Sequence, residues 1–162
     1  MYKIKLSISL LISFFIFSCS NNQSYSFNQK YSLAYIGGEF DGLLLKNYLL
    51  FSLENLDIYD PNSIYEISAN ISHSGNVYIT NIDNTSQREK ISTNLSYQIN
   101  NTLSRCEIMN DTINISQFYI YASSDKFLSN QMALTKIKKD NTESAVRTLI
   151  NKLRTISHKC NE

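Results

Sequence analysis

Two long stretches of alternating apolar and polar residues constrain the fold of this sequence more than any other feature. Tyr65–Ser72 reads Tyr-Glu-Ile-Ser-Ala-Asn-Ile-Ser, and Ile91–Ile99 reads Ile-Ser-Thr-Asn-Leu-Ser-Tyr-Gln-Ile. Because successive side chains of a strand point to opposite faces, each stretch predicts a strand with one buried face and one polar face. Antiparallel strands commonly keep one face in water, so the two stretches are predicted to be antiparallel neighbours.

Two further segments complete the predicted sheet. The alternation of Tyr31, Leu33 and Tyr35 with smaller residues predicts a first strand that ends at Gly37-Gly38, and Ile113–Tyr121 predicts a last strand. His73-Ser74-Gly75 predicts a bend or bulge in the second strand, which continues over Val77–Ile82 before a turn at 83–87.

A first amphipathic helix is predicted between the first two strands. Asp41 is its expected N-cap, and Asp60-Pro61-Asn62-Ser63 provides turn chemistry after it. Its apolar face is formed by residues at helical spacing: Leu45, Tyr48, Leu49, Ser52, Leu53 and Leu56. Leu43, Leu44 and Leu50 widen the apolar surface, which suggests a contact with a partner.

A second helix is predicted at the end of the chain, where Asp140 and Glu143 resemble a capping box. Its expected buried stripe is Val146, Leu149, Ile150, Leu153 and Ile156, with Arg147, Lys152 and Arg154 pointing outward. The order β-α-β-β-β-α predicts an α+β fold, a two-layer sandwich with two helices on one face of a four-stranded, mostly antiparallel sheet.

The first 18 residues have the parts of a secretory signal peptide. Lys3 and Lys5 supply positive charge, Leu6–Phe17 is an almost unbroken apolar run, and small Ser18 follows. The apolar run is shorter than the roughly 20 residues of a membrane-spanning helix. Ile16-Phe17-Ser18-Cys19 resembles the lipobox of bacterial lipoproteins, in which the cysteine becomes the lipidated first residue of the mature chain.

We therefore expect lipidation at Cys19. Residues 19–28 are predicted to be a tether and residues 29–160 a single domain. Ser20 and Asn21 follow the cysteine without an aspartate, which by resemblance to lipoprotein sorting favours the outer membrane. The alternative is a plain secreted protein in which Cys19 ends the signal by chance.

The charge balance argues against a nucleic-acid partner. After removal of residues 1–18, 13 basic residues face 14 acidic ones. Lys126–Lys159 nevertheless holds eight basic residues against Asp140 and Glu143, so this segment is predicted to form a positive surface. The alternative is the ordinary solvated face of a helix.

Two further cysteines, Cys106 and Cys160, belong to a chain that its signal sends to an oxidising compartment. We hypothesise that they form a disulfide; the alternative is two unrelated thiols. No nucleophile with a base, carboxylate pair, zinc-ligand spacing or phosphate loop is legible, so we expect neither an enzyme nor a metal or other cofactor. A binding or assembly role is favoured instead.

Several strings, in this order, resemble the lipopolysaccharide-assembly lipoprotein family, LptE. They are Arg88-x-x-Ile91-x-x-x-Leu95-x-Tyr97-x-Ile99, Asn130-Gln131-Met132-Ala133-Leu134-x-Lys136 and Leu149-Ile150-x-Lys152-Leu153. The Asn-Gln-Met-Ala-Leu-x-Lys string is the most specific of them. The resemblance covers most of the mature chain and implies the same two-layer fold.

The resemblance also implies a function. LptE proteins are not enzymes; they plug the LptD β-barrel in the outer membrane, facing the periplasm and the barrel lumen, and help lipopolysaccharide reach the outer leaflet. The basic residues that contact glycolipid phosphates in the family correspond by position to Arg88 and Lys136, with Lys138 and Lys139 as neighbours. Guanidinium and ammonium groups suit anionic phosphates.

Each of these residues also has a plainer interpretation. Arg88 could be a charge that protects an edge strand, and Lys136 an ordinary solvated lysine. The alternative function is a lipid-anchored periplasmic binding or envelope-scaffold domain without a barrel partner.

Overall fold

The computed structural model describes residues 27, 29–38, 41–79, 87–121, 126–157, 159 and 160. The predicted signal peptide, Cys19 and nearly all of the tether lie outside the described residues. The same holds for most of the predicted turn at 83–87, although Gln87 is already part of a strand.

A single four-stranded sheet forms one layer of the molecule. Its strands are β1 (Ser32–Gly37), β2 (Tyr65–Ile79), β3 (Gln87–Asn101) and β4 (Cys106–Tyr121), and they lie side by side in that order. β1 pairs with β2 in parallel, whereas the β2–β3 and β3–β4 pairs are antiparallel. The predicted α+β fold is confirmed.

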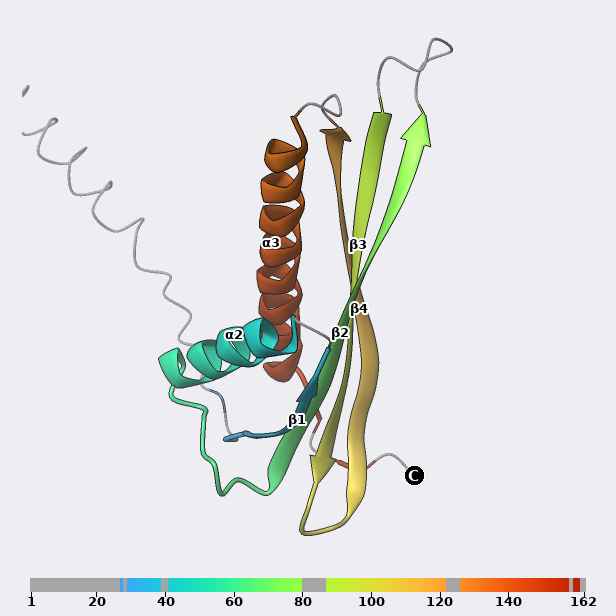
Figure 1. The fold of residues 1–162 in the computed structure, drawn as a ribbon. Coiled ribbons are helices and arrows are strands. Elements are labelled where there is room, and N and C mark those ends of the chain that lie inside the picture. Colours follow the sequence, from blue (N-terminus) through green and yellow to red (C-terminus); the bar gives the residue numbers. More distant parts are fainter. Residues whose placement is uncertain are drawn as a thin grey trace, which may run out of the picture.

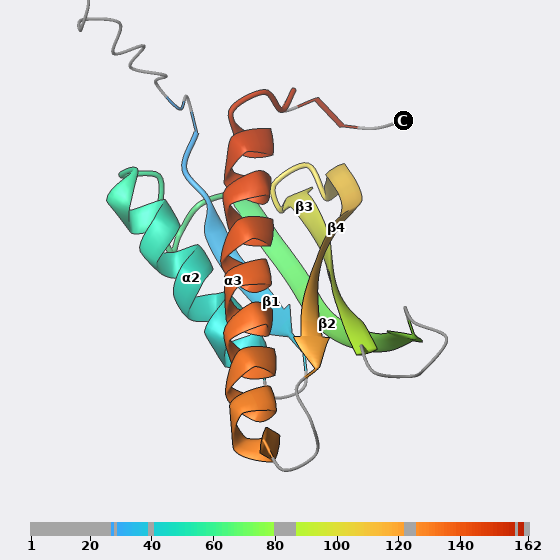
Figure 2. The same ribbon diagram turned by 90° about the horizontal axis from the view of Figure 1, so that it is seen from above.

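In the described part of the chain, two helices form the second layer, on one face of the sheet (Figure 1). Helix α2 spans Gly42–Asn55 and packs on α3 and β1, while α3 spans Phe127–Leu153 and packs on β3, β4 and α2. Viewed from above, the two helices lie next to each other over the strands (Figure 2). No described helix is both long and apolar enough to span a bilayer.

The core lies between these layers and is built from the residues that the two periodicities select. From α2 it takes Leu45, Leu49 and Leu53, and from the sheet residues of one parity such as Ile67, Leu95 and Ile99. Helix α3 adds Ala145, Val146, Leu149, Ile150 and Leu153, as predicted except for the alanine, and Ile156 packs against this core while only partly buried. Leu56, predicted to be buried, is 37% exposed because α2 ends one residue before it.

The predicted start of the last helix is wrong by more than three turns. Helix α3 begins at Phe127, so Asp140 and Glu143 lie in its middle and cap nothing. They form ion pairs one turn away instead, with Lys136 at 2.5 Å and Arg147 at 2.6 Å. Two acidic residues at this spacing fit a series of i,i+4 ion pairs within a helix as well as a capping box at its start. The sequence pattern alone does not distinguish the two, which explains the error.

Two strand predictions also need correction. β2 shows no bulge at His73-Ser74-Gly75, because its register with β3 is continuous from Tyr65 to Ile79. β4 begins at Cys106 rather than Ile113, and its early residues escape the alternation because the β3–β4 register shifts between Ile99 and Asn100. The extra residue of such an irregularity breaks the period of two.

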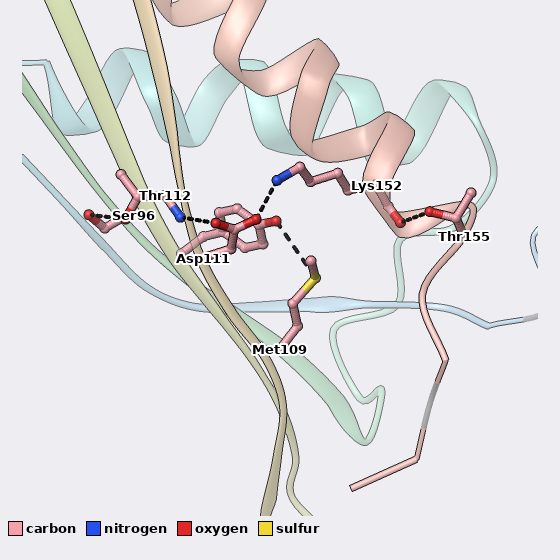
Figure 3. A network of polar contacts seen from close by, with 7 residues as sticks. Ser96, Met109, Asp111, Thr112, Lys152 and Thr155 are labelled. Atoms are coloured by element: carbon pink, nitrogen blue, oxygen red, sulfur yellow. Dashed lines mark hydrogen bonds and ion pairs between the residues drawn. The ribbon is translucent and has the colours of Figure 1, made fainter. Parts of the chain in front are cut away.

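Two long-range links fasten the last part of the chain to β4. A disulfide joins Cys106 to Cys160, the pair hypothesised from the sequence, with their Cα atoms 5.6 Å apart. Lys152 donates a hydrogen bond to the Asp111 carboxylate, which also accepts one from the backbone N–H of Thr112 (Figure 3). Lys152 therefore faces the sheet instead of pointing outward as predicted.

Candidate ligand-binding surface

The end of the molecule that holds the start of α3 exposes an unusual amount of apolar surface. Among the described residues, seven large apolar side chains lie near the ends of β2 and β4 and on the first turns of α3. Their exposed fractions run from 46% for Tyr78 to 72% for Leu128. The others are Val77, Phe118, Ile120, Phe127 and Met132. We call this end the distal end. Exposed apolar side chains gathered in one place mark interaction sites.

On the sheet, apolar and basic side chains share the face that points away from the helices. Tyr78 and Phe118 lie with ring centroids 6.0 Å apart, and Lys90 Nζ lies 5.9 Å from the Phe118 centroid. Arg88 is opposite Tyr78 on one side and Ile120 on the other. We call these five residues the outer-face cluster.

A second group lies on the first turns of α3. Phe127, Leu128 and Met132 are exposed, and Met132, Lys136 and Lys139 line a shallow depression of about 380 Å³ together with Gln131 and Thr135. Met132, Lys136 and Lys139 recur at i, i+4 and i+7 and therefore share one face of the helix. We call the five residues Phe127, Leu128, Met132, Lys136 and Lys139 the helix-tip cluster.

The structure therefore distributes the four sequence-predicted residues over three places. Arg88 is exposed on the outer face, since the buried residues of β3 have the opposite parity. Lys136 and Lys139 lie together on α3, where a hydrogen bond from Lys136 to Asp140 raises the pKa of the lysine. Lys138 faces another side of the helix, toward β2 and the first turn of α2.

Lys138 lines a recess of about 410 Å³, which also borders Gly38, Asp41 and His73. The His73 side chain is only 4% exposed; its Nδ1 lies 2.7 Å from Thr93 Oγ1 and its Nε2 lies 3.3 Å from Asp41 Oδ2. Burial lowers the pKa of His73, the Asp41 carboxylate opposes this effect, and the positive charge of Lys138 adds to it. Asp41 is at the predicted N-cap position but makes no side-chain cap hydrogen bond.

The rest of the outer face is polar and nearly uncharged. The residues that β2, β3 and β4 direct there are mainly serine and asparagine, for example Ser72, Asn94 and Ser116, and no described element covers them (Figure 1). This face presents short hydrogen-bonding side chains over the length of the sheet. It suits a polar, water-lined partner surface better than an apolar one.

Sequence reasoning missed Tyr78, Lys90 and Phe118. The available signal was a change within one parity of the last strand, from Asn114 and Ser116 to Phe118 and Ile120. An apolar pair at positions that are polar earlier in the same strand marks the place where the outer face changes character.

The chemistry of the distal end fits an amphiphile with an anionic headgroup. Cations next to exposed apolar side chains can bind phosphate while the apolar groups cover acyl chains. In the described part of the chain, no three His, Cys, Asp or Glu side chains are placed to hold a metal ion.

Three solved structures with a similar fold are described as bacterial lipoproteins. Rare lipoprotein B from Shewanella oneidensis superposes with a TM-score of 0.64 at 9% identity, over 78% of this chain and 95% of that one. A minor lipoprotein from Acinetobacter baumannii gives 0.58 at 12% identity, over 78% and 91%. A Caulobacter crescentus protein described as a lipoprotein gives 0.54 at 15% identity, over 77% and 88%.

No protein-family model matches the sequence, and no curated protein does. The similarity therefore lies in the three-dimensional structure, at identities where it establishes the fold alone. The chain has the fold of bacterial lipoproteins of the rare lipoprotein B type.

Proposed function

We propose that this protein is an outer-membrane lipoprotein subunit of a lipopolysaccharide translocon, which plugs an LptD-like β-barrel and contacts lipopolysaccharide. The observation that carries the proposal is the gathering of cations and exposed apolar side chains at the distal end of a lipoprotein fold. Lipid A offers phosphates and acyl chains to such a surface. Anchorage at Cys19 would keep the domain at the membrane.

The position of the tether supports this assignment. Phe27, at the end of the tether, lies under Arg154 with 5.5 Å between the guanidinium carbon and the ring centroid, at the C-terminal end of α3. A helix of 27 residues is roughly 40 Å long at about 1.5 Å per residue. The anchored end and the distal end are therefore separated by the length of α3, so the distal end can lie deep inside a barrel while the lipid stays in the membrane.

The polar outer face supports the plug role. A barrel lumen is lined by polar side chains and water, and the serine and asparagine side chains of the outer face could hydrogen-bond there. On the opposite side, Leu43 and Phe51 of α2 are 70% and 63% exposed, in line with the partner contact suggested for this helix.

Purification in mild detergent tests the proposal. We expect the full-length protein to co-purify with a large β-barrel protein in equimolar amount. Recovery of the lipoprotein alone, after extraction that keeps other outer-membrane complexes intact, would favour the lipid-anchored scaffold without a barrel partner. Cys19→Ser should abolish fatty-acid labelling and move the protein out of the membrane fraction.

A further inference from the structure

β2 has a long open edge, which the proposed function does not use. β1 pairs with β2 only from Ser32↔Glu66 to Gly37↔Asn70, whereas β2 continues to Ile79 in unbroken register with β3. In the described part of the chain, no strand pairs with the other side of β2 beyond Asn70. The segment Ile71–Ile79 is therefore a strand with one unpaired edge.

The end of β1 has a local cause. Gly38 has φ +124°, and a Cβ there would lie 2.5 Å from the carbonyl oxygen of Ile71, so only glycine fits. The chain then leaves the sheet and enters α2, where the Gly42 N–H donates to the Gly38 carbonyl at 2.7 Å. Because β1 turns away, no described strand lies beside the distal half of β2.

The open edge presents a regular set of backbone groups. Backbone N–H and C=O groups of alternate residues point to alternate sides of a strand. The Ile71 backbone lies against Gly38, on the side of β1, so His73, Gly75 and Val77 direct their backbone groups to the same open side. Ser74, Asn76 and Tyr78 direct theirs to β3.

This edge lacks the usual protection against pairing. Proteins protect edge strands with lysine, proline, bulges or inward-pointing charges. Ile71–Tyr78 carries no charge when His73 is neutral, and it contains no proline and no register shift. The first half of the opposite edge strand, β4, has such protection. It contains the charged residues Glu107 and Asp111, the second of which faces the helices, together with a register shift and the disulfide.

The edge also borders a recess that could bind side chains of a paired strand. Of the strands, α3 packs on β3 and β4, which leaves Val77 60% exposed although it lies on the helix-facing side of β2. The recess of about 410 Å³ lies at the foot of this edge. Lys138 lines it, half-buried, and forms no ion pair with a described residue.

We propose that the open edge of β2 binds an extended segment of a partner polypeptide, which joins the sheet as an additional strand where β1 leaves it. Its backbone pairs with His73, Gly75 and Val77, an apolar side chain covers Val77, and a carboxylate lies near Lys138. Main-chain pairing supplies the affinity and the recess supplies the specificity. The proposal does not depend on glycolipid binding.

Site-specific photo-crosslinking in cells tests the register of this pairing. The photoreactive amino acid p-benzoylphenylalanine replaces Ser74, Asn76 or Tyr78, three exposed outer-face residues, one at a time in the full-length protein. We expect crosslinks to one short segment of one polypeptide. Each shift of the photoreactive group by two residues along β2 should shift the crosslinked residue of the partner by about two positions, always in the same direction. The same group at Ser116, on β4, should not reach that segment.

Three outcomes would overturn the proposal: no crosslinked polypeptide at any of the three positions, linked residues without a common register, or links to a second copy of this chain. The readout is the order of the crosslinked partner residues along β2. Neither glycolipid binding nor a barrel partner determines that order, so this proposal and the proposed function can fail separately.

A matched pair of proline variants provides the control. Val77→Pro removes an N–H that faces the open edge, whereas Asn76→Pro removes one that faces β3. We expect Val77→Pro to lower crosslinking from position 74 at least tenfold with the thermal midpoint within a few degrees, and Asn76→Pro to lower the midpoint. If Val77→Pro does not fold, Val77→Lys replaces it, because a charge on the inward side of an edge blocks pairing without removing a hydrogen bond. Unchanged crosslinking in the folded edge variant would contradict the proposal.

Discussion

Thr93 connects two buried polar side chains at the centre of the molecule. Its hydroxyl lies 2.7 Å from His73 Nδ1 and accepts a hydrogen bond from Asn141 Nδ2 at 3.1 Å. Asn141 also donates to the Ile91 carbonyl, so β2, β3 and α3 meet in one polar cluster within an apolar core. Asn141 Oδ1 has no hydrogen-bond partner among the described residues. The cluster still favours this arrangement of the elements, because another arrangement would leave more of these buried polar groups unpaired.

His73 makes the stability of the fold depend on pH. Burial lowers its pKa in the folded protein, with Asp41 acting against this shift and Lys138 adding to it. The unfolded chain has an ordinary imidazole, with a pKa of about 6.5, so below that pH the unfolded state takes up the proton first. We expect the contribution of the neutral His73 to the free energy of unfolding to be complete above pH 6.5. This contribution should fall as the pH drops below 6.5 toward the folded-state pKa.

Urea unfolding at pH 8 and at pH 5.5 measures this effect. His73→Gln keeps a polar side chain but cannot take up a proton, so the variant should lose less free energy of unfolding between the two pH values than the natural protein. Equal losses in both proteins would assign the pH dependence to other groups.

At the scale of elements, α3 has two halves with different roles. Its C-terminal half carries the buried residues from Asn141 to Leu153, whereas in the first half only Asn130 is buried. The first half instead carries the helix-tip cluster. One continuous helix thus joins the packed core to the exposed distal end.

Alanine substitution in each half tests this division. Leu149 is fully buried, so Leu149→Ala should lower the free energy of unfolding by about 2–5 kcal/mol through lost burial and a cavity. Met132 is 67% exposed, so Met132→Ala should change it by less than about 0.5 kcal/mol. Equal effects in denaturant unfolding would contradict the division.

The disulfide belongs to the same scale, since it fastens the segment after α3 to the start of β4. It closes a loop with a sequence separation of 54 residues, for which the chain-entropy model gives a stabilisation of about 4 kcal/mol. We expect Cys106→Ser with Cys160→Ser to lower the free energy of unfolding by up to this amount. Reductant should destabilise the natural protein and leave the double variant unchanged, as differential scanning calorimetry would show.

At the scale of the whole molecule, the distal end combines two clusters on opposite sides of the sheet. The outer-face cluster and the helix-tip cluster each contain cations and apolar side chains. A ligand bound by Arg88 and Lys136 together would therefore have to extend around the end of the domain.

Charge reversal at both positions tests this binding mode. Arg88→Glu combined with Lys136→Glu should weaken binding of purified lipopolysaccharide at least tenfold. The thermal midpoint should fall by no more than a few degrees, since Arg88 is exposed and only the surface ion pair of Lys136 with Asp140 is lost. Lys46→Glu, an exposed lysine on α2, is the matched control and should bind normally. Unchanged affinity of the double variant would remove both residues from the site.

Local patterns in the sequence predicted the number, type and order of the described elements. Alternation in β2 and β3 and helical spacing in α2 report which side of each element is buried, because these periods depend only on neighbouring residues. They misplaced the start of α3, because an ion-pair series in the middle of this helix resembles a cap. They also missed Asn141 and Thr142, polar residues that are buried because of what lies across from them.

The amino-acid sequence by itself determined the periodicity of each element, and hence the two-layer α+β fold with one polar sheet face. Only the tertiary structure decided which groups meet: His73 with Asp41, Lys152 with Asp111, and the cations with the apolar side chains of the distal end. It also decided that β1 leaves β2 halfway and exposes an edge. The physical reason is range, since periodicity arises from adjacent residues, whereas these contacts join residues that only the folded chain brings together.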